Sequence, residues 1–353
     1  MSLHNNLRIR KIFFSLISIL FGIVIAFLIG EFAVRKLQLS KTWSTFEDSK
    51  RLMKYITTNK RIGFTRIPNS SFDAPRNIIY KSNGEGFRDR THEKENKSRK
   101  IRIAFLGDSV TEGFGVEESD RYSSLIEKEL NSKRDSFEIL NFAVAGHATR
   151  DELEILKSNV LAYHPDFVFL QINLNDFSRN VRLLKIDSSS TLNSTLEDPE
   201  KMKALNNASW LQKHSALYLY VAETYNYRKF RTGKTNDISS YAKPVTVEEW
   251  SAIDSLLSDM SRTCATSNAH LIVSYLPLAA EVLIKNDSLG NLVNVPLQEF
   301  CKKNGIDYAD VTIPFRKTSK PLELFLDDCH LSVEGNRVVS EIISYKLKSL
   351  FGN

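Results

Sequence analysis

The chain has 353 residues, of which 42% are hydrophobic and 25% are charged, so we expect a packed core, either in one large α/β domain with extensions or in two modest domains. Its formal charge of +6 is concentrated in residues 1–60, which carry ten Lys or Arg and three acids, whereas the rest of the chain is at −1. A nearly neutral body lacks the basic surface that nucleic acid requires, and a basic excess around an apolar segment suits anionic lipid headgroups instead.

The first expected element is an uncharged apolar run, residues 12–30, with basic residues on both sides of it. Its nineteen residues, as a helix, just span a hydrocarbon core of about 30 Å. A cleaved signal peptide and a buried core helix are the alternatives, but the run is longer than a usual signal region and a poor cleavage site follows Gly30. We predict an uncleaved transmembrane signal-anchor, with residues 1–11 as a basic cytoplasmic head and the body of the chain on the periplasmic or cell-surface side.

Beyond the anchor, residues 31–99 form a juxtamembrane extension that starts as a helix, is rich in turn formers, and ends in the charged run at 91–100. The main domain boundary is expected in that run. From residue 100 to residue 353, short apolar runs alternate with amphipathic helical patterns. This alternation predicts a parallel sheet covered by helices on both faces, with ligands bound beyond the carboxyl ends of its strands.

The predicted strands are Ile101–Gly107, Glu138–Phe142, Phe167–Ile172, Leu271–Leu276 and Ile306–Val311. The predicted helices between and after them are Tyr122–Asn131, Asp151–Tyr163, Val247–Ser267, Pro296–Lys303 and Val333–Leu350. A long insert, residues 177–246, separates the third strand from the fourth and contains an aromatic-rich helix candidate at Ser209–Phe230. We expect this insert to be either a helical subdomain on the sheet edge or a lid that binds substrate.

The three cysteines of the chain, Cys264, Cys301 and Cys329, are widely scattered along it. Three residues at such spacings predict neither a disulfide framework nor a zinc site. Cys264 and Cys301 fall in expected amphipathic helices, so we predict that they are small buried side chains.

The first strand is followed by a Gly-Asp-Ser turn that ends at Ser109 and leads into a helix. A serine at such a turn exposes its hydroxyl at the carboxyl edge of the sheet, where backbone N–H groups also point outward. The turn is not a G-x-S-x-G elbow, because residue 111 is Thr, and the glycines after it do not make a dinucleotide fingerprint. Taken alone, the motif is better explained as a plain turn.

Three later strand ends carry groups that would complete a site with this serine. Gly146 follows the second strand and lets a backbone N–H approach a ligand, and Asn175 follows the third strand and offers a side-chain amide. After the fifth strand, Asp327 and His330 stand three residues apart in a tight turn. Asp327 can therefore accept from one ring nitrogen of His330 and leave the other to take a proton from a serine.

Four such signals in this order resemble the four motif blocks of the SGNH (GDSL-type) hydrolase family, whose Ser, Gly, Asn and His match Ser109, Gly146, Asn175 and His330. The resemblance covers about 250 residues, from Arg102 to the end of the chain. The stretch at 83–90 and the apolar leader are also similar to membrane-anchored bacterial members. The family implies a flavodoxin-like three-layer α/β/α domain with about five parallel strands.

The same resemblance implies a role for each matched residue. It makes Ser109 the nucleophile, His330 the base and Asp327 the acid that orients the base. The backbone amides of Ser109 and Gly146 and the side chain of Asn175 would form the oxyanion hole, and no cofactor is implied. One position departs from the pattern: the third block usually reads Gly-x-Asn-Asp, and residue 173 is Asn here, so the local backbone is not expected to follow the family closely.

Other assignments of the last block remain open. Asp328 is an alternative acid, although it lies only two residues from His330 and fits the family pattern less well. A metal site at Asp327, Cys329 and His330 is another alternative, but no second cluster supplies further ligands, so no metal is expected.

The predicted roles of three polar residues beside the matched positions are less specific. His147 follows the glycine of the second block and either contacts substrate or is a polar loop residue. Asp108 and Asp176 are expected to hold the active-site turns by hydrogen bonds.

Together these observations predict a membrane-anchored serine esterase that acts on carboxylic esters, with short acyl or acetyl groups, through an acyl-enzyme. If a sugar hydroxyl replaces water as the second nucleophile, the same residues make a cell-envelope O-acyltransferase. A catalytically silent, membrane-tethered binding protein is the alternative from another class. The expected partners are a small-molecule, glycan or lipid ester and the membrane, and nucleic acid is not expected.

Overall fold

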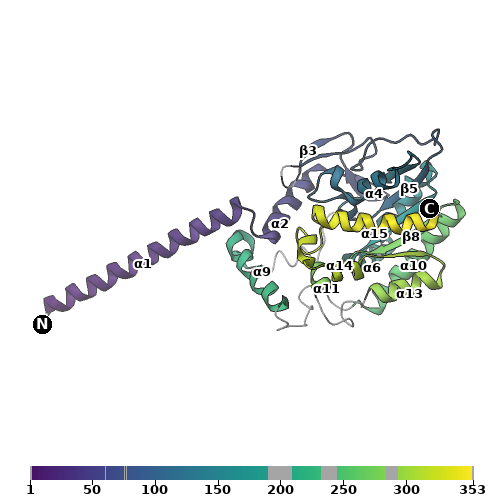
Figure 1. Cartoon of the computed structure of the whole chain (residues 1–353). Coiled ribbons are helices and arrows are strands. Elements are labelled where there is room, and N and C mark those ends of the chain that lie inside the picture. The colour runs from purple at the N-terminus through teal and green to yellow at the C-terminus, as the bar shows by residue number, and fades with distance from the viewer. Residues whose placement is uncertain are drawn as a thin grey trace. The chain divides into compact units, whose positions relative to one another are not determined.

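The computed structural model describes residues 2–59, 61–74, 76, 78–189, 209–231, 245–283 and 293–351. The chain divides into two compact units, of which the smaller comprises residues 1–47 and 199–228 and the larger residues 48–198 and 229–353. Some of the elements of both units are labelled in Figure 1.

A five-stranded parallel sheet forms the centre of the larger unit, in the order β6-β5-β7-β8-β9. In chain order this arrangement is 2-1-3-4-5, the flavodoxin-like order. The second strand is added on one side of β5 and the later strands on the other, so the topological switch point lies between β5 and β7. The predicted parallel sheet is therefore confirmed, and each strand end falls within one residue of its predicted place. The strands are β5 (Ile101–Leu106), β6 (Phe137–Asn141), β7 (Phe167–Ile172), β8 (His270–Tyr275) and β9 (Asp307–Asp310).

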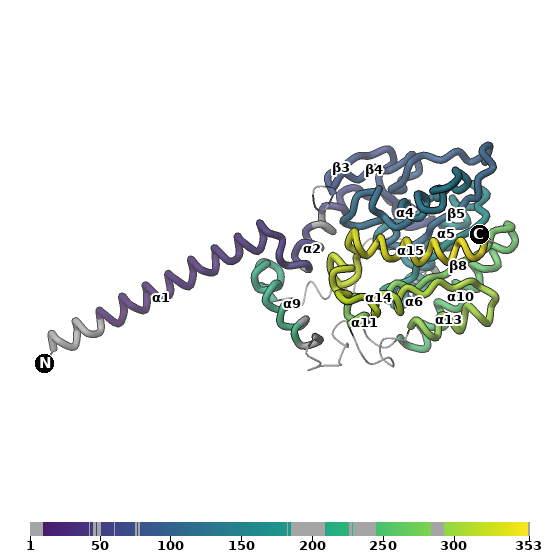
Figure 2. The backbone as a smooth tube through the Cα atoms, viewed as in Figure 1, coloured from purple at the N-terminus to yellow at the C-terminus, as the bar shows by residue number. Residues whose placement is uncertain are grey.

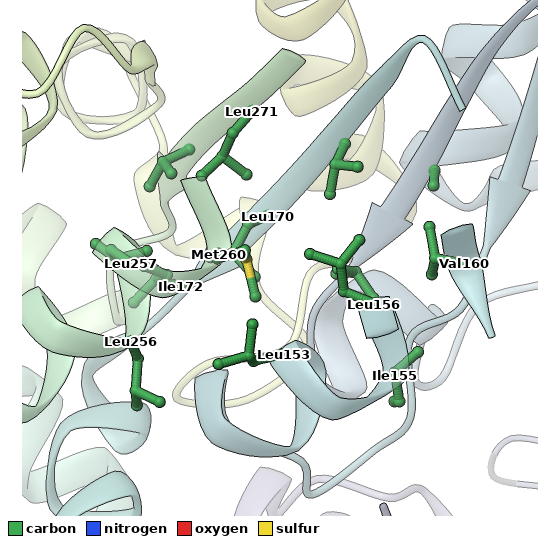
Figure 3. Close-up of a cluster of buried hydrophobic side chains, with 14 of the residues drawn as sticks. Leu153, Ile155, Leu156, Val160, Leu170, Ile172, Leu256, Leu257, Met260 and Leu271 are labelled. Carbon is green, nitrogen blue, oxygen red and sulfur yellow. The ribbon is translucent and has the colours of Figure 1, made fainter. Parts of the chain in front are cut away.

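Helices cover both faces of the sheet because successive strand residues point to opposite sides. In β5, Ile103 and Phe105 join a buried cluster with α4 and α15, whereas Ala104 and Leu106 join a second cluster with α5 and α10. Figure 3 shows part of the second cluster, where Leu153 and Leu156 of α5 and Met260 of α10 pack against Leu170 of β7. The helices are α4 (Tyr122–Leu130), α5 (Thr149–Ser158), α6 (Leu174–Ser189), α10 (Val247–Thr266), α11 (Ala279–Leu283), α13 (Asn294–Lys303), α14 (Thr312–Lys317) and α15 (Val333–Phe351).

The predicted helices of this unit occur close to their expected places. One of them is shorter than expected: the pattern over Asp151–Tyr163 is divided into α5 and a 3-10 turn, η4 (Val160–Tyr163). Another, α10, begins where the Thr246 hydroxyl and the Glu249 carboxylate each bond the other's backbone N–H, which is a capping box. As predicted, Cys264 and Cys301 are buried and free, and they belong to the cluster that also contains α5.

Residues 48–99 lie in the same compact unit as the sheet. They contain the 3-10 turn η1 (Met53–Tyr55) and two hairpins, β1 (Ile56–Asn59) with β2 (Gly63–Arg66) and β3 (Ser71–Asp73) with β4 (Ile79–Lys81). Figure 2 follows the chain from β3 and β4 into β5. The buried Arg102 side chain at the start of the sheet binds the charged run where the sequence predicts a boundary: its guanidinium donates to the carbonyls of Glu93 and Lys94 at 2.7 Å.

The smaller unit contains α1 (Ser2–Lys36), α8 (Trp210–His214) and α9 (Ala216–Arg231), and α2 (Lys41–Leu52) continues from it into the larger unit. The predicted helix at 209–230 is broken in two at Ser215. Within α1, residues 10–36 are long and apolar enough to cross a membrane, a property that a signal sequence shares. Residues 190–208 and 232–244 of the insert lie outside the described residues.

Candidate active site

Ser109 stands at the carboxyl end of β5, where the chain turns from the sheet into a short helix, α3 (Ser109–Glu112). Gly107 makes this turn possible, because a Cβ at that position would collide with the Thr111 hydroxyl. Asp108 caps α3 by accepting a backbone N–H at 3.0 Å. At the first position of α3, the Ser109 N–H has no carbonyl of the same helix to bond, so it can donate to a ligand beyond the sheet edge.

His330 and Asp327 lie in the loop before α15 and continue a chain of hydrogen bonds from Ser109. His330 Nε2 is 2.8 Å from Ser109 Oγ, and His330 Nδ1 is 2.6 Å from Asp327 Oδ2. The other oxygen of Asp327 accepts the backbone N–H of His330 at 2.7 Å and that of Cys329 at 3.0 Å. One carboxylate therefore fixes both the loop and the ring, and the three predicted residues meet in the order of nucleophile, base and orienting acid.

The imidazole of His330 is also held by an aromatic ring. Phe114 stacks on it with the ring centroids 4.0 Å apart and the planes 22° apart. Both side chains are buried, so the orientation of the imidazole is restrained by the stacked ring as well as by Asp327. An aromatic face beside an imidazole also favours its charged form.

The electrostatic surroundings of His330 favour its protonated form. Burial alone lowers the pKa of His330, but its interactions with the Asp327 carboxylate and then with Cys329 outweigh burial, so the pKa is raised well above its ordinary value. The Ser109 hydroxyl thus faces a strongly basic nitrogen. The same shift means that the ring must lose its own proton before it can accept one from the serine.

Gly146 and Asn175 lie just beyond β6 and β7 and are both exposed. Gly146 has a φ of +89° while a Cβ there would come no closer than 3.5 Å to Phe64, so its backbone conformation, and not lack of space, requires glycine. The Asn175 amide donates to Asp108 Oδ2 at 3.2 Å. Since an amide nitrogen carries two hydrogens, this bond leaves the second hydrogen for another acceptor.

Asn173, which replaces the glycine of the third block, uses its side chain to shape the same turn. Its amide donates to Asp108 Oδ2 at 2.9 Å, and its carbonyl accepts the Asn175 N–H at 3.2 Å. Asn173 does not adopt the left-handed backbone conformation that would demand glycine. The turn at Asn175 is therefore held by side-chain bonds that a glycine could not make.

Two buried carboxylates lie behind this turn. Asp176 Oδ2 accepts the Asn173 N–H at 2.8 Å, but among the described residues its Oδ1 and both oxygens of Glu152 have no hydrogen-bond partner. Burial and then the charge of Asp176 raise the pKa of Glu152 well above its usual range, and burial and the charge of Asp108 do the same for Asp176. The pair therefore retains a proton at a pH where exposed carboxylates have lost theirs.

The hairpin region before the sheet braces the nucleophile helix. Arg66 forms a buried two-point ion pair with Glu112, with both N–O distances at 2.7 Å. Arg88 donates to three backbone carbonyls at the end of α3 and just beyond it, and its guanidinium carbon lies 3.5 Å from the centre of the Tyr80 ring. Glu112 also accepts the Ala145 N–H at 3.3 Å, which ties the loop of the second block to the nucleophile helix.

The remaining sequence predictions near the site have clear outcomes. His147 is fully buried, its Nε2 is 2.9 Å from the Phe64 carbonyl, and burial lowers the pKa of its imidazole to about 3. Its structural interpretation is therefore the better one. Asp108 and Asp176 hold the active-site turns by hydrogen bonds, as predicted.

The structure favours Asp327 over the two alternatives for the last motif block, which are Asp328 as the acid and a metal site. Asp328 is exposed, whereas Asp327 is buried against the ring of His330. Ligand atoms of Asp327, Cys329 and His330 do lie within 4.8 Å of one another, as a metal site would need. Since His330 Nδ1 already bonds Asp327, a metal bound there would have to break that link.

Sequence reasoning missed Phe114, Glu152 and the Arg66–Glu112 pair. Phe114 stands in a Gly-Phe-Gly run that could have been noticed as an aromatic residue fixed near the nucleophile. No local signal indicates that Glu152 is buried or that Arg66 meets Glu112, because both depend on contacts between segments far apart in the chain.

Comparison with known proteins identifies the family. The sequence model of the GDSL-like Lipase/Acylhydrolase family matches residues 105–338. The uncharacterized protein YpmR of Bacillus subtilis (strain 168) is 29% identical over 187 residues, which are 49% of this chain and 68% of YpmR.

Two solved structures have a similar arrangement of the chain. The lipase/acylhydrolase from Enterococcus faecalis is 15% identical with a TM-score of 0.43, over 70% of this chain and 95% of its own. The acetylxylan esterase Axe2 from Geobacillus stearothermophilus is 14% identical with a TM-score of 0.42, over 69% of this chain and 92% of its own. The family match itself spans about two thirds of the chain and includes Ser109, Gly146, Asn175 and His330. The chain therefore belongs to the GDSL-like lipase/acylhydrolase family and is a serine hydrolase that acts on esters.

Proposed function

We propose that this protein is a membrane-anchored esterase in which Ser109 is the nucleophile, His330 the general base and Asp327 the acid that orients it. The proposal depends above all on one observation, the unbroken chain of contacts of 2.8 Å from Ser109 to His330 and 2.6 Å from His330 to Asp327. These lengths allow proton transfer without any rearrangement of the side chains.

In the first half of the reaction, Ser109 Oγ attacks the ester carbonyl carbon while His330 Nε2 takes the hydroxyl proton. The carbonyl oxygen becomes an oxyanion, which accepts hydrogen bonds from the Ser109 and Gly146 N–H groups and from the second hydrogen of the Asn175 amide. When the tetrahedral intermediate collapses, the alcohol leaves with the proton from His330. The acyl group remains on Ser109 as an ester.

In the second half, water attacks the acyl-enzyme while His330 again takes the proton, and the carboxylic acid is released as Ser109 recovers its hydrogen. Asp327 remains ionised throughout and stabilises the imidazolium that forms twice in each cycle. Hydrolysis, with water as the acceptor, is the activity of the family to which the chain belongs. Short acyl esters such as acetyl esters are the proposed substrates.

The anchor of the proposal is α1. Its candidate membrane span, residues 10–36, contains the uncharged run 12–30 and extends about 40 Å as a helix, more than the thickness of the hydrocarbon core. Arg8, Arg10 and Lys11 precede the apolar run, which favours a cytoplasmic amino terminus and an extracytoplasmic catalytic domain.

A fluorophosphonate probe tests the catalytic part of the proposal on the full-length protein. The wild type should be labelled, Ser109→Ala should not, and Ser132→Ala, which changes an exposed serine elsewhere, should be labelled like the wild type. Turnover of acetyl, butyryl and longer esters by the same three proteins, with acetylated glycans as further substrates, then gives the acyl preference and the acceptor.

A wild type that the probe does not label would contradict the assignment of Ser109. Labelling with equal turnover in the wild type and Ser109→Ala would place the ester hydrolysis elsewhere.

A further inference from the structure

Helix α9 begins against the carboxyl end of α1. Glu31 accepts the N–H groups of Ala216 and Leu217 at 2.9 and 3.0 Å and the Ser215 hydroxyl at 2.8 Å. A carboxylate in this place satisfies N–H groups that the helix leaves unbonded and suits the positive end of its dipole. Leu217 also packs at Gly30, where an added Cβ would be 3.0 Å from it.

Further bonds hold α8 and α9 to the same stretch of chain. The Arg35 guanidinium donates to the His214 carbonyl, at the end of α8, at 2.7 Å. Two turns into α9, Glu223 accepts the Ser40 hydroxyl at 2.9 Å and the Lys41 N–H at 3.1 Å. Figure 1 shows α9 beside the end of α1 and pointing in a different direction from it. These bonds involve backbone as well as side-chain atoms, so they fix where α9 lies along α1.

That position coincides with the edge of the apolar segment. Gly30, which Leu217 contacts, is the last residue of the uncharged run 12–30, and Glu31 is the first charged residue after it. If α1 spans a bilayer, the boundary between hydrocarbon and headgroups therefore falls where α8 ends and α9 begins.

The exposed faces of α8 and α9 carry the aromatic, apolar and basic side chains that are typical of the boundary between hydrocarbon and headgroups. Trp210 is 69% exposed and Val221 58% exposed, and Tyr218 and Tyr225 fall on the same face of α9 as Val221, three and four residues away from it. Trp and Tyr concentrate at membrane interfaces because their rings are apolar with a polar edge. The exposed Arg228 adds a basic group that suits anionic headgroups.

We propose that α8 and α9 lie in the headgroup layer of the membrane that α1 enters, with Trp210, Tyr218 and Val221 facing lipid. The inference rests on the proposed anchoring by α1 and extends it, because it gives the insert between β7 and β8 a lipid surface as its partner. An interfacial helix of this kind places its apolar face about 5–10 Å into the boundary between headgroups and acyl chains. The catalytic domain would then be joined to the membrane at two points of the chain, before β1 and between β7 and β8.

The test uses the full-length protein in vesicles of phosphatidylcholine and phosphatidylglycerol. An NBD fluorophore is attached to Val221→Cys or, in a separate sample, to Trp210→Cys. The matched control is Val247→Cys, at a valine that is 87% exposed at the start of α10 in the larger unit. Wild-type protein, with its three native cysteines, is treated in parallel as the blank.

Lipids that carry a nitroxide near the headgroup then quench any label that touches them. The labels at residues 221 and 210 should lose about threefold more fluorescence than the label at residue 247, as expected for a helix at interfacial depth. Equal quenching at residues 221 and 247, in protein that floats with the vesicles in alkaline carbonate, would overturn the inference and leave the anchor in place. Protein that does not float with the vesicles would overturn the anchor, and the inference with it.

Discussion

On one side of Ser109, His330 and Asp327 form a linear chain in which each polar atom has a partner within 2.8 Å. On the other side, the Asn173 and Asn175 amides share a single oxygen of Asp108, near the buried carboxylates of Glu152 and Asp176, which have oxygens without a hydrogen-bond partner among the described residues. A linear chain fails when any one link is removed. A network divides its energy among several bonds, so each member should count for less.

The two sides also differ in what they do with protons. In the proposed reaction the triad moves a proton in every cycle, and the raised pKa of His330 would set the pH above which it can do so. The Glu152–Asp176 pair holds a proton that takes no part in the proposed reaction. The first should therefore control the pH dependence of rate, whereas the second should affect only that of stability, to which the raised pKa of His330 also contributes.

Breaking the linear chain should have the largest effect. We expect Asp327→Asn to lower kcat about 10⁴-fold, because an amide cannot hold the imidazole in the productive tautomer or stabilise its charge. Asp328→Asn changes the exposed neighbouring acid and should leave kcat within about threefold of wild type. Steady-state hydrolysis of an acetyl ester measures both, and an equal loss in the two variants would remove Asp327 from its assigned role.

On the network side, Asn175→Ala should lower kcat about 10²–10³-fold, as the loss of one oxyanion donor does elsewhere. Asn173→Ala is the matched variant, since it also removes an amide bonded to Asp108 Oδ2. It should cost less, because Asn173 is buried and shapes the turn only. Comparable losses in the two variants would mean that Asn175 acts by holding Asp108 and not by binding the oxyanion.

The linear side could be predicted from the sequence and the network side only in part, for a physical reason. Asp327 and His330 are three residues apart, so local geometry alone brings them together, and Ser109 is placed by the first strand of a recognisable α/β pattern. The strands could be predicted almost to the residue because most of them are short apolar runs between amphipathic helices.

The features that escaped prediction depend on segments far apart in the chain. Glu152 of α5 is buried near Asp176 of α6, and Arg66 meets Glu112 across 46 residues. The break at Ser215 has the same origin, because Glu31 bonds both the Ser215 hydroxyl and the start of α9. Nothing within a short window of sequence indicates these partners.

The proton retained by the buried carboxyls of Glu152 and Asp176 gives a smaller, thermodynamic test of the network side. A carboxyl whose pKa is raised in the folded protein keeps a proton that the unfolded chain releases above about pH 4.3. The free energy of unfolding therefore falls as the pH rises from there toward the raised pKa, by about 1.4 kcal/mol per pH unit for each such proton. Glu152→Gln removes one titrating group and should make the unfolding temperature less dependent on pH between 5 and 8. Glu154→Gln, on the same helix, should keep the wild-type dependence, and identical slopes in all three proteins would mean that Glu152 does not retain this proton.

The smallest expected effect tests whether Phe114 belongs to the linear side. Only neutral His330 can take the serine proton, so kcat/KM should rise with pH through a midpoint above the ordinary value of 6.5. Phe114→Leu removes the ring that favours the imidazolium and should lower that midpoint by about 0.5–1 pH unit. Phe72→Leu changes a ring of the same buried cluster that stacks on Tyr55 instead, and should leave the midpoint in place. A midpoint that shifts only in Phe114→Leu would show that the Phe114 ring raises the pKa of His330. Equal midpoints in the wild type and both variants would mean that Phe114 only packs beside His330.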